Sequence, residues 1–305
     1  IENGSWEQEA VPALISPDPA SKCIITLKDG KETRYYLDVV FPVLHGPRGE
    51  DGTVQSIFEM MNIPYVSCGV ASSAICMDKV FSKKILQQSN LPVVDYKVYY
   101  KKELQTNLTE IISEVEVSLG YPCFVKPANL GSSVGISKAK SREELKAALL
   151  LAAEYDTKIL VEKFIDAREI ECSVLGNDAP RASLPGEIIP SREFYDYAAK
   201  YLDGDKSKLL LPAPLSQKDI ATIQQLAIEA FKALGCSGMA RVDFLMSKVS
   251  GKIYINELNT IPGFTKISMY PKMWEISGLS YGALIDELIQ LAIERHKQKN
   301  ELKLA

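Results

Sequence analysis

Apolar segments alternate along the chain with stretches of helical periodicity, in an order typical of α/β proteins. Apolar runs at 37–44, 63–67, 123–126 and 158–161 predict buried strands. Helical patterns occupy residues 53–61, 78–88, 107–119, 141–155, 216–234 and 281–296. We therefore expect an α/β (α+β mixed) fold, in which residues 37–67 form a strand–helix–strand unit with parallel strands.

Polar residues interrupt a predicted hairpin at 240–257, where two strands are joined by a short loop. Because strand side chains alternate, Arg241 and Asp243 share one face of the first strand, and Glu257 and Asn259 share one face of the second. Carboxylates and an amide are hard oxygen ligands, which suit magnesium better than zinc or copper. The alternative is a solvated strand face whose charges lie in water.

A loop rich in glycine and serine, residues 127–135, separates two further predicted strands. It matches neither a Walker A loop nor a Rossmann loop, since both lead into a helix. Backbone N–H groups with the hydroxyls of Ser132 and Ser133 could wrap a phosphate that Lys126 neutralises. A plain hairpin turn is the alternative.

A short extended run, 162–165, follows the strand at 158–161. It combines an aromatic side chain, an aliphatic side chain and backbone groups that are free to form hydrogen bonds. Such a run suits an adenine ring, and the carboxylate of Glu169 suits the two hydroxyls of a ribose. The alternative is that the apolar residues here are core.

Two other segments carry candidate chemistry. His45 and Glu50 follow the apolar run 37–44, where ligands bind in strand–helix–strand units, although turn chemistry in a Gly-rich loop explains them equally well. Residues 191–210 are tyrosine-rich, charged and without periodicity, which favours a lid.

Composition narrows the class of protein. A chain of 305 residues predicts two or three domains, and its net charge of −4 gives no general attraction to nucleic acid or to anionic membranes. No apolar run approaches the length of a membrane span. The six scattered cysteines indicate reduced thiols in the cytoplasm. With only His45 and His296 available, a histidine zinc site is not expected.

Six motifs stand together in one order over most of the chain from Leu37 onward: FPVLHGPRGEDGT, CMDK, FVKPANLGSSVGISK, FYDYAAKY, RVDF and NELNTIPGFTKISMYP. In this order and spacing they resemble the ATP-grasp superfamily and, within it, the D-alanine–D-alanine ligases. The resemblance implies an ATP-grasp fold of three domains with ATP between the central and C-terminal ones. The expected domains are 1–68, 69–161 and 162–305, with the lid at about 191–210 in the last.

The resemblance also implies a role for each motif residue toward ATP. The phosphates would contact Lys79, Lys126 and Ser133. Adenine would lie on Glu162, Lys163, Phe164 and Ile165, and the ribose on Glu169. Two magnesium ions, with Mn²⁺ as the alternative metal, would be held by Asp243, Glu257 and Asn259.

For the reaction itself, the resemblance implies that one D-alanine forms an acyl phosphate, which the amine of a second D-alanine then attacks. His45 and Glu50 would lie near the first D-alanine, and Ser268 and Met269 would bind the carboxylate of the second. Arg241 and the Gly263 N–H would stabilise the oxyanion, and Ser132 matches the family's catalytic serine. Lys200 and Tyr201, on the lid, would close to exclude water from the acyl phosphate, and Tyr201 favours D-alanine over D-lactate as the second substrate. The product serves peptidoglycan synthesis, and the expected protein is a cytoplasmic homodimer.

The start of the chain departs from the family pattern. The residues IENGSW resemble the segment that follows the family's first βαβ unit, so we expect the N-terminal domain to lack that unit and its substrate-anchoring glutamate. The open alternatives are a D-alanine–D-serine or D-alanine–D-lactate ligase and a truncated, non-catalytic nucleotide-binding protein.

Overall fold

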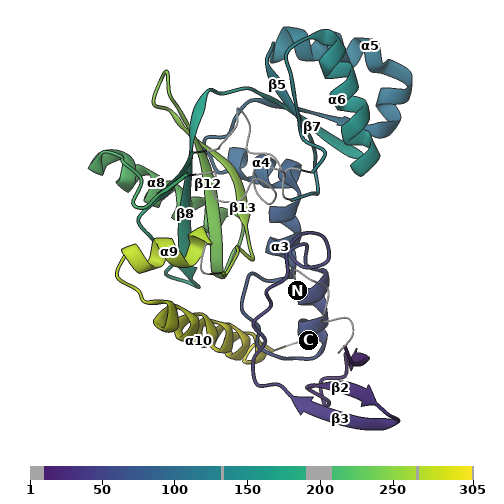
Figure 1. Cartoon of the computed structure of the whole chain (residues 1–305), viewed down its shortest axis with the longest axis vertical. Helices are drawn as coiled ribbons and strands as arrows, with labels where there is room; N and C mark the ends of the chain where they lie inside the picture. Colours follow the sequence, from purple (N-terminus) through teal and green to yellow (C-terminus); the bar gives the residue numbers. More distant parts are fainter. Residues whose placement is uncertain (1–9, 132–133, 190–207, 266–267, 304–305) are drawn as a thin grey trace.

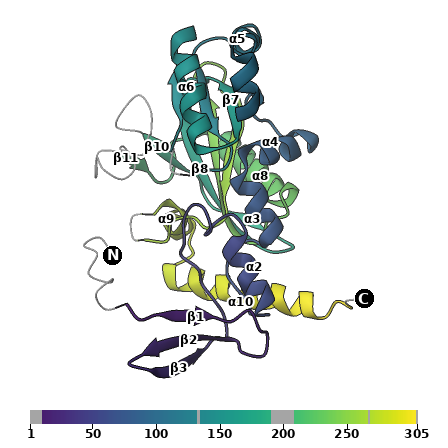
Figure 2. The same cartoon turned by 90° about the vertical axis from the view of Figure 1, so that its right-hand side faces the viewer.

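Three β-sheets and the helices packed on them make up the described part of the chain, residues 10–131, 134–189, 208–265 and 268–303 of a computed structural model (Figures 1 and 2). Within these residues every pairing between named strands is antiparallel. The mixed α/β class is confirmed.

The first sheet projects from the rest of the molecule, at the lower end of Figure 1. Its strands, in spatial order, are β1 (Ala13–Ile15), β2 (Cys23–Lys28) and β3 (Lys31–Tyr36). Helix α2 (Thr53–Met60) follows, with Gly52 as its N-cap. Every residue of β3 is exposed, so this sheet contributes little to the hydrophobic core.

The predicted pairing of 37–44 with 63–67 is confirmed in its parallel direction, but neither segment forms an extended strand. Only a single parallel bridge, between Val40 and Tyr65, joins these segments. The second half of the first run is exposed, with Val43 at 52% and Leu44 at 47%, so its apolar sequence does not reflect burial between strands. The predicted helix between the two segments is confirmed.

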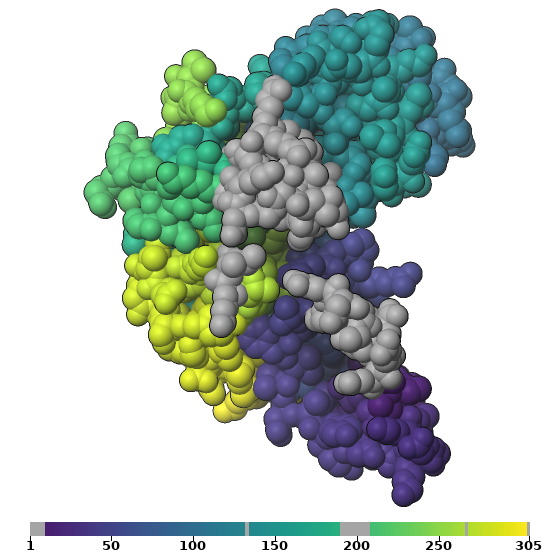
Figure 3. Space-filling view, viewed as in Figure 1, coloured from purple at the N-terminus to yellow at the C-terminus, as the bar shows by residue number. Residues whose placement is uncertain are grey.

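The second sheet forms the upper lobe in Figures 1 and 3. In spatial order its strands are β4 (Tyr96–Tyr100), β7 (Lys158–Lys163), β5 (Cys123–Pro127) and β6 (Ser137–Ala139). Helices α5 (Lys101–Ser118) and α6 (Arg142–Tyr155) pack on this sheet through a core that includes Val115, Leu149 and Val161. Helix α6 begins after the Ser141 cap, as its capping box predicts.

The third sheet is the largest and carries the predicted hairpin. In spatial order its strands are β11 (Lys208–Leu210), β10 (Gly186–Ile189), β8 (Ala167–Gly176), β12 (Gly238–Ser247) and β13 (Ile253–Asn259), with β9 (Arg181–Ala182) paired to β8. The apolar stripe of α8 (Gln217–Ala233) packs on one face, as its period predicts. Helices α9 (Met269–Ile276) and α10 (Tyr281–Asn300) pack near Leu175 and Met239.

Helices α3 (Val70–Met77) and α4 (Lys79–Gln88) connect the lobes (Figure 1). Leu86 of α4 joins the core of the third sheet, whereas Val80 packs against Leu160 of the second. Asp78 caps α4 by accepting hydrogen bonds from two backbone N–H groups of its first turn. The first turn of α4 therefore lies between the two larger sheets.

Within the residues that the structure describes, no single helix is long and apolar enough to cross a membrane; α9 and α10 reach the required length and composition only as a pair bent by 108°.

Candidate active site

The hairpin of β12 and β13 brings its polar residues onto one face by means of a β-bulge. Asp243 lies opposite Glu257, but the next pair is Phe244 with Ile255, so Asn256 is an extra residue on β13. Strict alternation would place Ile255 and Glu257 on the same face. The bulge instead leaves Ile255 buried in the core and puts Glu257 beside Asp243. The predicted convergence of the hairpin side chains is confirmed.

Arg241 is the charged centre of this face. Its Nε and Nη2 donate to the two oxygens of Asp243, at 2.7 and 2.8 Å, and its Nε also lies 3.1 Å from Oε2 of Glu171 on β8. Asn259 Nδ2 donates to Asp243 Oδ2 at 2.9 Å. Burial alone would lower the pKa of Arg241, but Asp243, Glu171 and Glu257 raise it well above its usual value. The guanidinium therefore stays charged.

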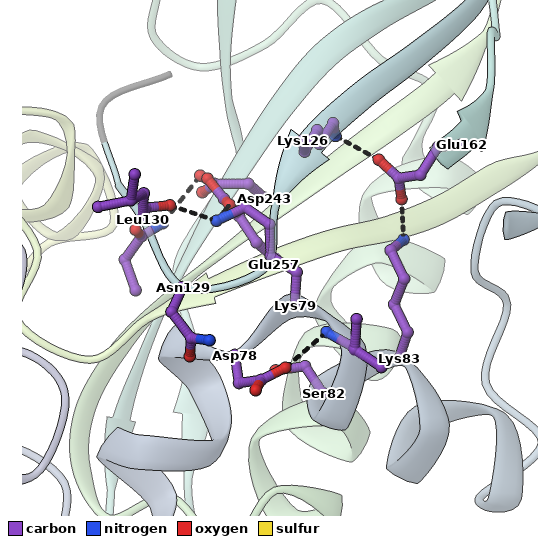
Figure 4. Close-up of polar contacts among 12 residues, drawn as sticks. Asp78, Lys79, Ser82, Lys83, Lys126, Asn129, Leu130, Glu162, Asp243 and Glu257 are labelled. Atoms are coloured by element: carbon purple, nitrogen blue, oxygen red, sulfur yellow. Dashed lines mark hydrogen bonds and ion pairs between the residues drawn. The ribbon is translucent and has the colours of Figure 1, made fainter. Parts of the chain in front are cut away.

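Lys79 connects the hairpin to the Gly/Ser loop (Figure 4). Its Nζ donates to the Leu130 carbonyl at 2.6 Å and lies 3.5 Å from Oε2 of Glu257. The cleft around it is lined by Glu50, Cys76, Met77, Lys79, Leu130, Gly131, Glu257, Leu258, Asn259 and Thr260. Three predicted groups, the phosphate loop, the metal ligands and Glu50, thus border one cleft.

Lys126 is held by a buried carboxylate. It forms an ion pair with Oε2 of Glu162, and Lys83 on α4 lies 2.5 Å from Oε1 of the same carboxylate (Figure 4). Burial would raise the pKa of Glu162, but Lys126 and Lys83 outweigh it and lower that pKa to about 2. Burial would lower the pKa of Lys126, but Glu162 outweighs it and raises that pKa, so Glu162 and Lys126 are both charged at neutral pH.

The predicted adenine segment differs from expectation in two respects. Glu162 and Lys163 belong to β7 rather than following it. The backbone N–H of Lys163 donates to the Asp95 carbonyl and that of Phe164 to the Pro122 carbonyl, so the expectation of free backbone groups is wrong for these two donors. Ile165 is half-buried, and Glu169 lies on β8, opposite Leu245.

His45 and Glu50 stand on the loop before α2. The Gly46 N–H donates to Glu50 Oε2 at 2.6 Å, and His45 Nδ1 lies 3.1 Å from the Ile261 carbonyl oxygen. The pKa of Glu50 is raised, chiefly by burial, although Gly46, His45 and Arg241 act in the opposite direction. Glu50 thus borders the same cleft as Glu257.

Gly263, Ser268 and Met269 surround the start of α9. A Cβ on Gly263 would lie 2.7 Å from Ser268 Oγ, which explains why a glycine stands there. The Met269 side chain is buried with Ile188 and Met273, so only its backbone can face a ligand. Ser268 is the N-cap of α9, and helix N-termini favour carboxylates.

Four predicted residues, Ser132, Ser133, Lys200 and Tyr201, lie outside the described residues, as does most of the predicted lid. The end of the lid segment, residues 208–210, forms strand β11.

Two charged residues of the site were missed by sequence reasoning. Lys83 follows Lys79 by four residues, the spacing that places two side chains on one helix face. Glu171 follows Glu169 by two residues on a strand and therefore shares its face. Both signals are present in the sequence, but a lysine-rich helix and an alternating strand are common on protein surfaces.

The donor set suits a hard divalent cation. Asp243, Glu257 and Asn259 offer only oxygen ligands on adjacent positions of two strands, and Lys79 and Arg241 balance the carboxylates here. Among the described residues, no three His, Cys, Asp or Glu side chains are grouped as a metal site. The predicted set instead combines two carboxylates with the amide of Asn259.

Comparison with known proteins agrees with this geometry. The family model described as "D-ala D-ala ligase C-terminus" matches residues 85–290, and "D-ala D-ala ligase N-terminus" matches residues 2–68. A D-alanine–D-alanine ligase of Thermoanaerobacter sp. (strain X514) is 59% identical over 299 residues, which are 98% of this chain and 83% of the relative. One of Caldicellulosiruptor bescii is 54% identical over 99% of this chain and 82% of the relative.

Solved structures show the same relationship. The D-alanine–D-alanine ligase of Coxiella burnetii superimposes with a TM-score of 0.84 at 41% identity, covering 98% of this chain and 79% of its own. The VanG D-Ala:D-Ser ligase of Enterococcus faecalis reaches 0.84 at 39% identity, with 95% and 82% covered. The fold predicted from the six motifs, ATP-grasp, is confirmed. The chain belongs to the D-alanine–D-alanine ligase family.

Proposed function

We propose that this protein joins two D-alanine molecules into D-alanyl-D-alanine, with ATP cleaved to ADP and phosphate. The carboxylate of the first D-alanine attacks the γ-phosphorus of ATP, which yields an acyl phosphate and ADP. The amine of the second D-alanine attacks the acyl carbon and releases phosphate. The observation that carries the proposal is the cleft in which Lys79, Glu257 and Glu50 meet, in a chain of this family.

The predicted residues that the structure describes have surroundings that support a role in this reaction, and the others take theirs from the family resemblance. Lys79 and Lys126, with the hydroxyls of Ser132 and Ser133, bind the phosphates. Glu162, Lys163, Phe164 and Ile165 bind adenine, chiefly through carbonyl groups and side chains, and Glu169 binds the ribose.

The remaining residues act on the amino acids. Glu50 and His45 position the first D-alanine, and the N-terminus of α9 at Ser268 and Met269 binds the carboxylate of the second. Arg241 and the Gly263 N–H stabilise the oxyanion at the acyl carbon. Lys200 and Tyr201 close over the intermediate and exclude water.

Asp243, Glu257 and Asn259 would hold two Mg²⁺ ions, which neutralise phosphate charge when bound. Mn²⁺ accepts the same oxygen ligands. Arg241 restrains Asp243 through two hydrogen bonds, so the ligand carboxylate is oriented before any cation arrives.

Phosphate release from ATP tests this function. We expect phosphate to be released at the maximal rate with D-alanine as the sole amino acid. Neither D-serine nor D-lactate should be required. Absence of release with all three substrates would overturn the ligase activity. Release that requires D-serine or D-lactate would instead overturn the choice of second substrate.

Glu50 predicts a pH dependence of the first binding step. Its raised pKa means that the carboxylate becomes neutral, as pH falls, at a higher pH than an ordinary glutamate does. If Glu50 attracts the ammonium of the first D-alanine, kcat/KM for D-alanine falls as pH drops through that pKa. Glu50→Gln should lower kcat/KM at neutral pH and remove this acid limb. An acid limb retained in Glu50→Gln would assign the titration to another group.

The protein further functions, in this proposal, as a cytoplasmic homodimer that supplies peptidoglycan precursors, without binding nucleic acid or membranes. Light scattering coupled to size exclusion measures the dimer directly.

A further inference from the structure

A buried row of three charges lies behind the phosphate-binding side of the cleft. Glu162, on the central strand β7, has its carboxylate between the ammonium groups of Lys83 and Lys126, one on each oxygen (Figure 4). Tyr96 and Phe124 are its cross-strand neighbours. Because aromatic rings flank it, the carboxylate has little access to water and depends on its two cations.

The two lysines are not equivalent. The Lys83 side chain is 2% exposed and that of Lys126 is 12% exposed. Lys83 Nζ also lies 5.8 Å from the centre of the Tyr96 ring, within the buried space between α4 and the second sheet. Lys126 stands on β5, one residue before the strand ends and the Gly/Ser loop follows. Only Lys126 is placed to turn toward a ligand at the cleft.

A difficulty arises if Lys126 is a phosphate ligand, as the proposed function takes it to be. Its ammonium is engaged by Glu162 in this structure. Turning toward a phosphate would remove one cation from a fully buried carboxylate, and a buried charge without a partner is strongly unfavourable.

We propose that Lys83 is the permanent counter-ion of Glu162 and thereby a positioning residue that allows Lys126 to bind the phosphates of ATP. While the site is empty, the Glu162 carboxylate lies between Lys83 and Lys126 and holds Lys126 in place. When a nucleotide binds, Lys126 moves to the phosphate and the Lys83–Glu162 pair remains electrically neutral. Lys83 itself touches no substrate.

The low pKa of Glu162, about 2, agrees with a carboxylate stabilised by two cations. The pKa of Lys83 is lowered by burial, against the opposing effect of Glu162.

The test compares nucleotide affinity in three variants. In Lys83→Met, Glu162 has only Lys126 as a partner, so we expect KM for ATP and Kd for ADP to rise about tenfold or more, with KM for D-alanine unchanged. In the double variant Lys83→Met with Glu162→Gln, no buried carboxylate remains to hold Lys126, so ADP affinity should recover about threefold or more relative to Lys83→Met, and the remaining deficit reflects the lost contact of Glu162 with adenine. Lys84→Met, an exposed neighbour on α4, is the matched control and should change neither constant.

Several measured outcomes would overturn the role proposed for Lys83. ADP affinity of Lys83→Met within twofold of the wild-type value overturns the proposal, as does a double variant no better than the single one. A merely structural role would lower the melting temperature and the active fraction without a selective change in KM for ATP. If Lys83→Met does not fold, the double variant is compared with Glu162→Gln alone, and ADP affinities that differ by more than about threefold between these two variants overturn the proposal.

ADP binding, measured by calorimetry with Mg²⁺ present, needs no turnover. A wild-type protein that binds ADP but releases no phosphate would therefore overturn the proposed function and still allow the role of Lys83 to be judged.

Discussion

Replacing Arg241 by methionine is expected to lower kcat for dipeptide formation by about 10²- to 10³-fold, the usual effect of removing one oxyanion donor. The same change leaves Asp243 and Glu171 without the guanidinium that lies within 3.1 Å of each. Removing one partner of a fully buried ion pair destabilises a protein by about 3–5 kcal/mol, and the loss is expected to be smaller here because the Arg241 side chain is 21% exposed. We therefore expect a lower melting temperature together with the kinetic loss.

Arg241→Lys separates these two effects. Lysine keeps the positive charge between the carboxylates but cannot reproduce the two parallel hydrogen bonds to Asp243. It should recover most of the stability and little of kcat.

A matched ion pair in the same sheet provides the control. Arg168 donates to both oxygens of Glu187, each at 2.7 Å, from the face of β8 opposite to Glu169. Arg168→Met should lower stability and leave kcat within a fewfold of wild type. If Arg168→Met reduced kcat as much as Arg241→Met does, the kinetic loss would reflect sheet stability rather than oxyanion stabilisation.

Glu257→Gln is expected to raise the Mg²⁺ concentration needed for half-maximal phosphate release and to lower kcat by about 10²-fold or more, since a metal-bound phosphoryl group loses several kcal/mol of charge stabilisation. The amide preserves the volume of the side chain but removes the charge that faces Asp243 and Lys79. Phosphate release, titrated with Mg²⁺ at saturating ATP and D-alanine, measures both effects.

Glu187→Gln is the control for this titration, because it removes a buried carboxylate from the same sheet at a distance from the proposed ligands. Its Mg²⁺ dependence should match that of wild type. A Glu257→Gln protein with an unchanged Mg²⁺ midpoint would show that Glu257 is not a metal ligand.

The buried row Lys83–Glu162–Lys126 changes how the nucleotide side of the cleft is understood. The family resemblance assigns Glu162 to adenine, whereas here its carboxylate is engaged by two lysines. Glu162 can contact adenine and keep a charged partner only if Lys83 stays with it when a nucleotide binds. The double variant tests this point.

Local patterns along the chain were sufficient for several elements and for the choice of most candidate residues. The helical patterns that start at residues 141 and 216 depend on neighbouring residues alone, and the observed helices begin directly after Ser141 and Ser216, whose side chains cap them. The six motifs likewise depend only on order and spacing, and they were enough to recognise the family. The apolar run at 37–44 shows the limit, because hydrophobicity alone does not reveal whether a strand has neighbours.

The relation between distant segments required the folded chain. Alternation predicts that Glu257 and Asn259 share a face, but only the bulge at Asn256 places that face beside Asp243 and Arg241. The same holds for Lys83, whose importance arises because α4 packs between two sheets and buries its ammonium against β7. Periodicity is a local property of the backbone, whereas register and burial depend on packing between segments far apart in sequence. For that reason the charged residues of the hairpin could be picked out from the chain, whereas the buried ion pair between Lys83 and Glu162 could not.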